Sequence, residues 1–243
     1  MKSLPLWVLT WGILLLPGMA IADSPTKEFT DKFPIAQCQF QNTGDHPYFM
    51  LHINRELHLN NWQCFADGKC DDFEELVIRV LPETRMITFK LEGKMMTVDT
   101  RVVEKYETID GEFSRRSRNF LSVCQETQDV YYFGEDVLLA EGSHPGQWVA
   151  GVDGALPGMI FPGGAFLLGT RYYQKIAPKA KALDRAEHME MGLKITIPAG
   201  TFGNCVKIEE TTPMDQQVRS VKQYCEGIGL VTDGDLELVR IDP

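Results

Sequence analysis

The chain has 243 residues, of which 44% are hydrophobic and 24% are charged. This composition can build a sizeable core and excludes a wholly disordered chain, and no repeat or biased segment indicates a collagen, a coiled coil or a solenoid. The formal net charge is -10, from 24 basic and 34 acidic side chains. Because Lys and Arg are not in excess to neutralise phosphates, nucleic acid is not expected as a partner.

The chain begins with the three parts of a secretory signal peptide. Lys2 gives a positive start, Leu6–Leu16 is apolar, and residues 20–22 (Ala-Ile-Ala) form a small-x-small cleavage pattern. The apolar stretch is shorter than the ~20 residues that cross a bilayer, and no later segment is long and apolar enough to do so. We therefore predict a signal peptide over residues 1–22, a mature chain over residues 23–243 without a transmembrane span, and a periplasmic or secreted location.

Cysteine usage agrees with export, because an even number of cysteines in an oxidising compartment is expected to pair. Cys64 and Cys70 bracket an Asp-Gly turn, which favours a small disulfide-closed hairpin. Cys205 and Cys225 lie in two β-rich runs joined by a turn, which places them across an antiparallel pair of strands. Elimination leaves Cys38 and Cys124 for each other. The six are Cys38, Cys64, Cys70, Cys124, Cys205 and Cys225.

The mature chain is dominated by strand patterns. Runs of β-branched or alternating residues follow one another, separated by turn residues such as Glu92-Gly93 and Asp110-Gly111. Lys179–Glu187 has some helix propensity but few apolar residues to anchor a helix. The pattern predicts one mainly β domain over residues 23–243, with a single antiparallel, strongly curved sheet or an open barrel and at most short helices. The runs are Leu76–Val80, Met86–Leu91, Val98–Thr108, Phe113–Val123, Val130–Phe133 and Met189–Ile197.

A segment over residues 141–170 has a different texture, with many glycines, three prolines and large apolar side chains. It is too apolar for a solvated linker, and strands resume after it, so we expect an ordered loop that covers one end or the concave face of the sheet. If a pocket lies under this loop, Trp148, Met159, Phe161 and Phe166 are the candidate ligand-binding residues. The alternative is that they fill the core.

Several blocks resemble a widespread family of uncharacterised bacterial secreted or periplasmic proteins. The resemblance covers roughly residues 98–240. The family has no assigned reaction, so membership implies export and a β-rich fold but no chemistry. The region around His46–Trp62 departs from the family pattern. The blocks are Thr100–Glu104, Tyr132–Asp136, Ala150–Ala155, Arg171–Gln174, Asp184–Glu187, Pro198–Cys205 and Gly227–Val231.

One group of charged residues could perform hydrolysis, because paired carboxylates near an arginine can separate acid and base roles. The alternative is an ion-pair network that fixes strand register. No nucleophile motif or phosphate-binding loop accompanies the group. Its members are Asp184, Arg185, Glu187, Glu209 and Glu210.

Imidazole and thioether groups suit copper, and a copper site is therefore a second hypothesis. In a strand, however, His188 shares a face with Glu190, whereas Met189 and Met191 share the other face. Met is also a common core filler. No other cofactor is expected. The candidate ligands are His52, His58, His188, Met189 and Met191.

These patterns favour an exported, non-catalytic binding protein that holds a hydrophobic small molecule or lipid, or binds an envelope partner protein. Periplasmic copper binding is the alternative function, and an uncharacterised hydrolase is the third.

Overall fold

The computed structural model describes residues 28–242, and the predicted signal peptide lies outside them. Fourteen strands form one sheet, and β2 and β3 form a separate hairpin. Among the described residues, helix is confined to α1 (Trp62–Ala66) and the short 3-10 helices η1 (Ile35–Gln37) and η2 (Pro178–Ala180). The prediction of a mainly antiparallel β fold with at most short helices is therefore confirmed.

The strands of the sheet follow the order β10-β8-β7-β6-β5-β4-β16-β15-β14-β13-β12-β11, and β1 and β9 pair with β7 and β8. Their bounds are β1 (Phe40–Gln41), β2 (Asp45–His46), β3 (Phe49–Met50), β4 (Glu56–Asn60), β5 (Glu74–Leu91), β6 (Lys94–Ile109), β7 (Glu112–Cys124), β8 (Val130–Leu139), β9 (Trp148–Val149), β10 (Gly158–Phe161), β11 (Arg171–Tyr173), β12 (Arg185–Ile197), β13 (Gly200–Thr212), β14 (Asp215–Cys225), β15 (Gly229–Asp233) and β16 (Leu236–Asp242).

The sheet curves until its two ends, β10 and β11, approach each other. A Cβ added to Gly158 would lie only 2.1 Å from the carbonyl oxygen of Gln174, so the close approach requires glycine. A single bridge joins Leu156 to Ile176, and the two edge strands share no ladder. The sheet is thus strongly curved but not closed into a barrel.

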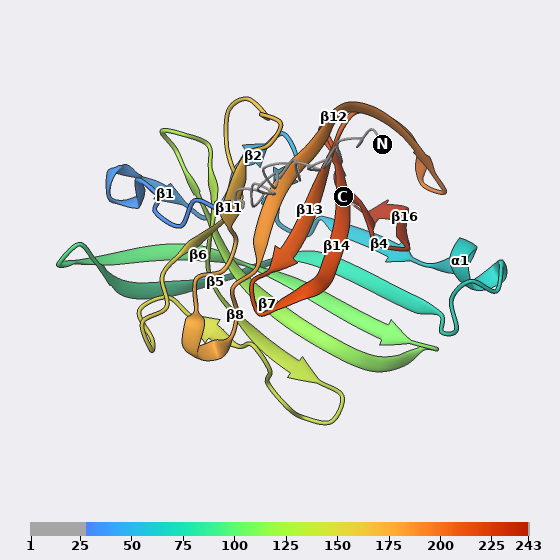
Figure 1. Ribbon diagram of the computed structural model, residues 1–243, viewed down its shortest axis with the longest axis horizontal. Helices are drawn as coiled ribbons and strands as arrows, with labels where there is room; N and C mark the ends of the chain where they lie inside the picture. Colours follow the sequence, from blue (N-terminus) through green and yellow to red (C-terminus); the bar gives the residue numbers. More distant parts are fainter. Residues whose placement is uncertain (1–27, 243) are drawn as a thin grey trace, which may run out of the picture.

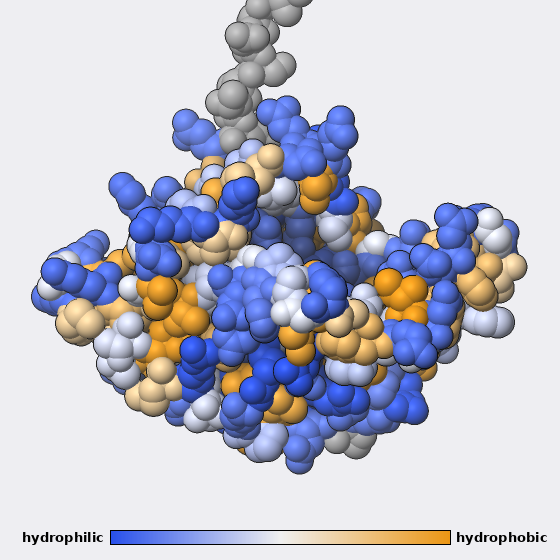
Figure 2. Space-filling view, turned by 90° about the horizontal axis from the view of Figure 1, so that it is seen from below, coloured by the Kyte–Doolittle hydropathy of each residue, from blue (hydrophilic) through white to orange (hydrophobic). Residues whose placement is uncertain are grey.

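Two long hairpins extend beyond the curved part of the sheet. In Figure 1 the β5–β6 hairpin points to the left and the β12–β13 hairpin to the upper right, while α1 lies at the right-hand end. The face seen from below in Figure 2 carries apolar residues in separate patches among hydrophilic ones.

The segment over residues 141–170 is ordered but is not only a loop. Trp148–Val149 forms β9 and Gly158–Phe161 forms β10, and both pair with β8. The expected covering loop therefore partly extends the sheet edge. The reason is that short runs between glycines still offer backbone groups to an unpaired strand.

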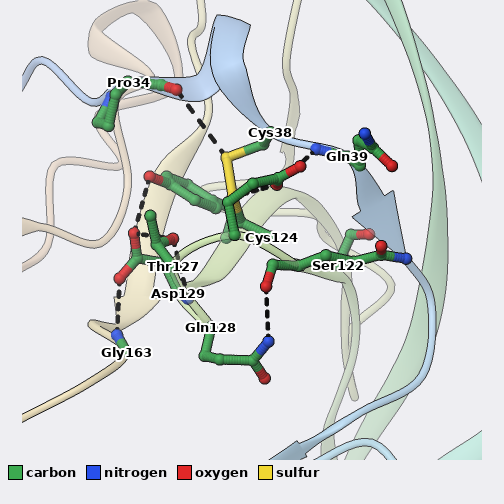
Figure 3. Close-up of a disulfide and its surroundings, with 12 residues drawn as sticks. Pro34, Cys38, Gln39, Ser122, Cys124, Thr127, Gln128, Asp129 and Gly163 are labelled. Carbon is green, nitrogen blue, oxygen red and sulfur yellow. Dashed lines mark hydrogen bonds between the residues drawn. A yellow bond between two sulfur atoms is a disulfide. The ribbon is translucent and has the colours of Figure 1, made fainter.

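The three disulfides join the predicted partners, with Cα–Cα distances of 5.1 Å for Cys38–Cys124, 5.4 Å for Cys64–Cys70 and 4.0 Å for Cys205–Cys225. Figure 3 shows how Cys38–Cys124 fastens the N-terminal segment to the end of β7. Three disulfides favour an oxidising, extracellular environment. Within residues 28–242, no helix is long and apolar enough to span a membrane.

Candidate functional site: a cavity with an apolar and a charged end

A cavity of about 270 Å³ lies inside the curved sheet. Its wall is formed by alternate side chains of β4 to β8 on one side and of β13 to β15 on the other, because every second residue of a strand points to the same face. The wall changes character along the strands. On β6, Val103 is followed on the same face by Lys105 and then Glu107.

One end of the cavity is mostly apolar, and its charged residue, Arg55, donates to the backbone carbonyl oxygen of Ile228. The wall of this end carries aliphatic side chains from six strands, and the β2–β3 hairpin covers it with Tyr48, Phe49 and Met50. This end therefore suits a hydrocarbon guest. The aliphatic residues are Leu57, Ile78, Val80, Val103, Leu121, Ile160, Ile228 and Leu230.

The covering hairpin is held by a buried histidine. His46 Nε2 lies 3.0 Å from the carbonyl oxygen of Pro162, and its Nδ1 accepts the backbone N–H of Tyr48 at 3.1 Å. Burial lowers the pKa of His46, which keeps the ring neutral and suits one donating and one accepting nitrogen. The backbone N–H of Gly227 also donates to the carbonyl oxygen of Pro47 at 2.8 Å. The hairpin is thus fixed at both of its sides.

The other end of the cavity contains a first ion-pair group centred on Lys175. Lys175 Nζ lies 2.9 Å from Glu135 and 2.8 Å from Asp184, and the Tyr132 hydroxyl donates to Glu135 at 2.5 Å. Burial alone would raise the pKa of Glu135, but Lys175 and Tyr132 lower it below its usual value. Glu135 is therefore charged, and it shares one lysine with Asp184.

A β-bulge brings Tyr132 and Glu135 to the same face of β8, although they are three residues apart. Phe120 pairs with Gly134 and Leu121 with Tyr132, so Phe133 is left without a partner. Gly134 has φ +149°, and a Cβ there would lie 2.6 Å from the Trp148 carbonyl oxygen. Glycine is needed at this position, and it sets the geometry of the group.

A second ion-pair group is centred on Lys222 of β14. Lys222 Nζ lies 2.7 Å from Glu210 and 3.5 Å from Asp233, and the Gln174 amide donates to Glu210 at 2.9 Å. Burial alone would lower the pKa of Lys222, but Glu210 and Asp233 raise it well above its usual value. In this group too, two carboxylates share one lysine.

Within the described residues, three further cations line the cavity without an ion pair: Lys105, Arg115 and Arg55, whose guanidinium donates to the backbone carbonyl oxygen of Ile228 at 2.9 Å. Within residues 28–242, neither Lys105 nor Arg115 forms a side-chain hydrogen bond or an ion pair, and the buried Nε of Arg115 has no acceptor. The positive charge of Lys222, followed by burial, lowers the pKa of Lys105. Glu107 is opposite Arg115 in the β6–β7 register and is the nearest acid by position.

A second hollow of about 370 Å³ continues the cavity beyond its charged end. The two share Lys105, Glu107 and Asp233. The second hollow is also lined by acidic side chains from the start of β5 and from the turn after β15, so we call it the acidic mouth of the cavity. These are Glu74, Glu75 and Asp235.

The predicted ligand-binding residues lie in β9 and β10 and in the loop after β10, and they do not line the cavity. Trp148 is 4% exposed and packs edge-on against Tyr132, with ring centroids 5.4 Å apart. Met159 and Phe161 are buried, and Phe166 is partly buried. Their neighbour Ile160 does line the cavity. A direct role for the four in binding stays a prediction.

Phe161 and Phe166 belong to a packed group with Tyr172 and His188, which we call the aromatic cluster. The rings of Phe166 and His188 are stacked with centroids 3.8 Å apart, and Phe161 lies 5.2 Å from Tyr224 of the cavity wall. The cluster therefore adjoins the cavity without being hollow itself.

The five predicted copper ligands lie apart. His188 is buried and has neighbours at both ring nitrogens, Tyr172 at 3.3 Å and the Leu167 carbonyl at 3.2 Å. Burial lowers the pKa of His188 to about 4. Met189 and Met191 are 39% and 53% exposed.

The two remaining histidines bind carboxylates. His52 contacts Asp45, and His58 lies 3.3 Å from Glu56 and 3.0 Å from Asp242. The Arg240 guanidinium is also 2.9 Å from His58 Nε2, and this positive charge disfavours a cation there. In the described part of the chain, His58 is the one residue of the five that belongs to a cluster with metal-ligand spacing.

The proposed hydrolytic group is divided between two faces of the sheet. Asp184 and Glu210 line the cavity and hold Lys175 and Lys222. The other members pair elsewhere: Glu187 with Arg171, Glu209 with Arg219, and Arg185 over the Phe29 ring. The arrangement matches the ion-pair alternative rather than a shared catalytic cleft.

The chain matches no protein-family model, and no curated protein or solved structure shows significant similarity to it. The resemblance to an uncharacterised secreted family therefore stays a prediction.

The sequence interpretation missed most of the charged residues of the cavity. Alternation was the available signal, because Val103, Lys105 and Glu107 share one face of β6, and Arg115, Ser117 and Asn119 share one face of β7. The alternation is hidden because the opposite face is also buried at Val102, Phe120 and Ser122. Lys175 lies outside any strand and gives no periodic signal.

Proposed function

We propose that this protein is an exported binding protein that holds a small amphiphilic molecule, such as a single-chain lipid, in the cavity of its curved sheet. The observation that carries the proposal is the division of the cavity into an aliphatic end and a charged end that opens into a second hollow. Such a wall matches a guest with a hydrocarbon part and a polar part.

The charged groups support binding rather than turnover. Lys175 and Lys222 are each held by two carboxylates, so their charges are compensated and their amines are protonated. A lysine nucleophile needs a free amine, and a general acid needs a carboxyl with a raised pKa. The lowered pKa of Glu135 and the lowered pKa of Glu210 go in the opposite direction.

The test is binding of N-phenyl-1-naphthylamine, a neutral apolar dye, to the oxidised mature protein. Ile78 is partly exposed and lines the cavity, so Ile78→Trp fills hollow space without displacing packed neighbours. We expect fluorescence enhancement with the wild type, its loss in Ile78→Trp, and an unchanged unfolding midpoint in urea. Val152→Trp, at a side chain that is 57% exposed and outside the cavity, is the matched control. Equal dye binding by both variants would contradict the proposal.

Native mass spectrometry of protein purified from its own compartment provides an independent check. We expect an adduct of lipid size that organic extraction removes. Absence of any adduct, together with absence of dye binding, would reject a small-molecule guest.

A further inference from the structure

The strands give the order of the chemical groups along the cavity. Going along β6, Val103 lies at the apolar end, Lys105 follows, and Thr108 belongs to the mouth. On β7, which is antiparallel, Leu121 lies at the apolar end and Arg115 at the charged end. Lys105 and Arg115 are thus placed between the hydrocarbon site and the acidic mouth.

Lys105 and Arg115 lack the ion pairs that hold Lys175 and Lys222. Lys175 and Lys222 take four carboxylates between them: Glu135, Asp184, Glu210 and Asp233. Within the described residues, no carboxylate forms an ion pair with Lys105 or Arg115, although Asp233, Glu210 and Glu107 favour the charged form of Lys105 from a greater distance. Lys105 and Arg115 therefore keep side-chain donors that a guest can use.

The unpartnered groups also need hydrogen-bond acceptors. An arginine offers five N–H donors and a lysine three, and a buried donor without an acceptor costs free energy. The Nε of Arg115 is buried and has no acceptor within the described residues. A carboxylate or phosphate oxygen is the acceptor that fits a guanidinium best, because two parallel hydrogen bonds can form.

We infer that the guest is an anionic amphiphile whose acidic group, a carboxylate or a phosphate monoester, is bound between Lys105 and Arg115 with its hydrocarbon tail at the apolar end. This inference rests on the proposed function and names the class of guest. The carboxylates Glu74, Glu75 and Asp235 lie further out, at the mouth. A guest whose charge stayed at the mouth would have to be a cation, so the sign of the charge that is bound distinguishes the two positions.

The experiment is isothermal titration calorimetry of the oxidised, delipidated mature protein with dodecanoate, dodecyl phosphate, dodecanol and dodecylammonium, all below their micellar concentrations. The two anions are expected to bind at least about tenfold more tightly than dodecanol, because a hydrogen bond to a charged group adds about that much affinity. The ratio between the two anions identifies the preferred acidic group. Dodecylammonium is expected to bind most weakly.

Two variants locate the charge. Lys105→Met and Arg115→Met are each expected to weaken dodecanoate binding about tenfold and to leave dodecanol binding within about twofold. Lys105→Arg, which keeps the charge, is expected to retain dodecanoate binding. Lys207→Met is the matched control, because Lys207 pairs with Glu190 and does not line the cavity.

The outcomes separate the two proposals. If dodecanol binds as tightly as dodecanoate, or dodecylammonium binds more tightly, the anionic head group is wrong while the binding function stands. If none of the four molecules binds, the proposed function itself is wrong. The comparison of ligands uses the wild-type protein, so it decides the question even if a variant does not fold.

Discussion

The aromatic cluster and the cavity meet at β10, and yet one is filled while the other is hollow. Phe161 is 1% exposed and packs against His188 and Tyr224, whereas the preceding residue, Ile160, lines the cavity. The cluster is built from neutral rings that can interdigitate. The cavity wall carries lysines and carboxylates, whose full desolvation would cost more than packing returns. The charged side chains of the wall therefore explain why the cavity stays hollow.

The largest expected difference between the two regions is in the cost of truncating a side chain. We expect Phe161→Ala to lower the free energy of unfolding by about 4 kcal/mol, because it leaves a void in a packed group. Ile160→Ala only enlarges existing hollow space and is expected to cost about 1 kcal/mol. Urea unfolding followed by fluorescence measures both. Equal losses would show that the cavity is packed as tightly as the cluster.

The next difference lies within the charged end of the cavity, between a lysine with partners and one without. Lys175→Met leaves Glu135, which is 3% exposed, without its ion-pair partner, and we expect a loss of about 3 kcal/mol in unfolding free energy. Lys105→Met removes a charge that has no ion pair and is expected to change stability by less than about 0.5 kcal/mol. A large loss in Lys105→Met would mean that this lysine is held by the wall rather than kept for a guest.

Low pH is expected to destabilise the aromatic cluster through His188. His188 in the folded chain has a pKa lowered by burial from 6.5 to about 4. As the pH falls from 6.5 towards 4, the unfolded chain takes up a proton that the folded chain does not, so stability decreases over this window by at most about 3 kcal/mol. We expect His188→Gln to have a smaller acid-induced loss than the wild type. The exposed His52 supplies the control His52→Gln, which is expected to follow the wild type.

The smallest expected effect concerns two disulfides that close loops of different length. Cys38–Cys124 has a sequence separation of 86, whereas Cys64–Cys70 has a separation of 6 and includes Cys70, which lines the mouth of the cavity. Because the entropy lost by the unfolded chain grows with loop length, replacing the first pair by serines is expected to cost about 2 kcal/mol more than replacing the second. Differential scanning calorimetry of the two double variants measures the difference, and a larger cost at the mouth would contradict it.

Local patterns predicted the fold well where one strand interaction sufficed. Cys205 and Cys225 were placed across an antiparallel pair by the turn between them, and they are register partners. The Asp-Gly turn at residues 110–111 joins β6 to β7 as expected. Both features are set by residues that are close together in the sequence, and local sequence patterns can therefore predict them.

The cavity depends on contacts between distant residues and could not be predicted in the same way. Glu135 meets Lys175 across 40 residues, and Lys105 is near Lys222 only because the sheet curves back on itself. The bulge at Gly134 also shifts the alternation by one, so that period-two counting assigns Glu135 to the wrong face. Large apolar residues were predicted as ligand contacts, and they lie in β9, in β10 and in the loop after it, outside the cavity lining.

The anchored β2–β3 hairpin covers the apolar end of the cavity, and the opposite end adjoins the second hollow. A molecule that enters through the mouth goes in tail first, and it leaves head first by the same path. Any protein that delivers or collects such a molecule would meet only the head group, beside the rim made by the start of β5 and the end of β15. Exchange would then be governed by how fast Lys105 and Arg115 release the head, and the length of the buried chain would set the residence time.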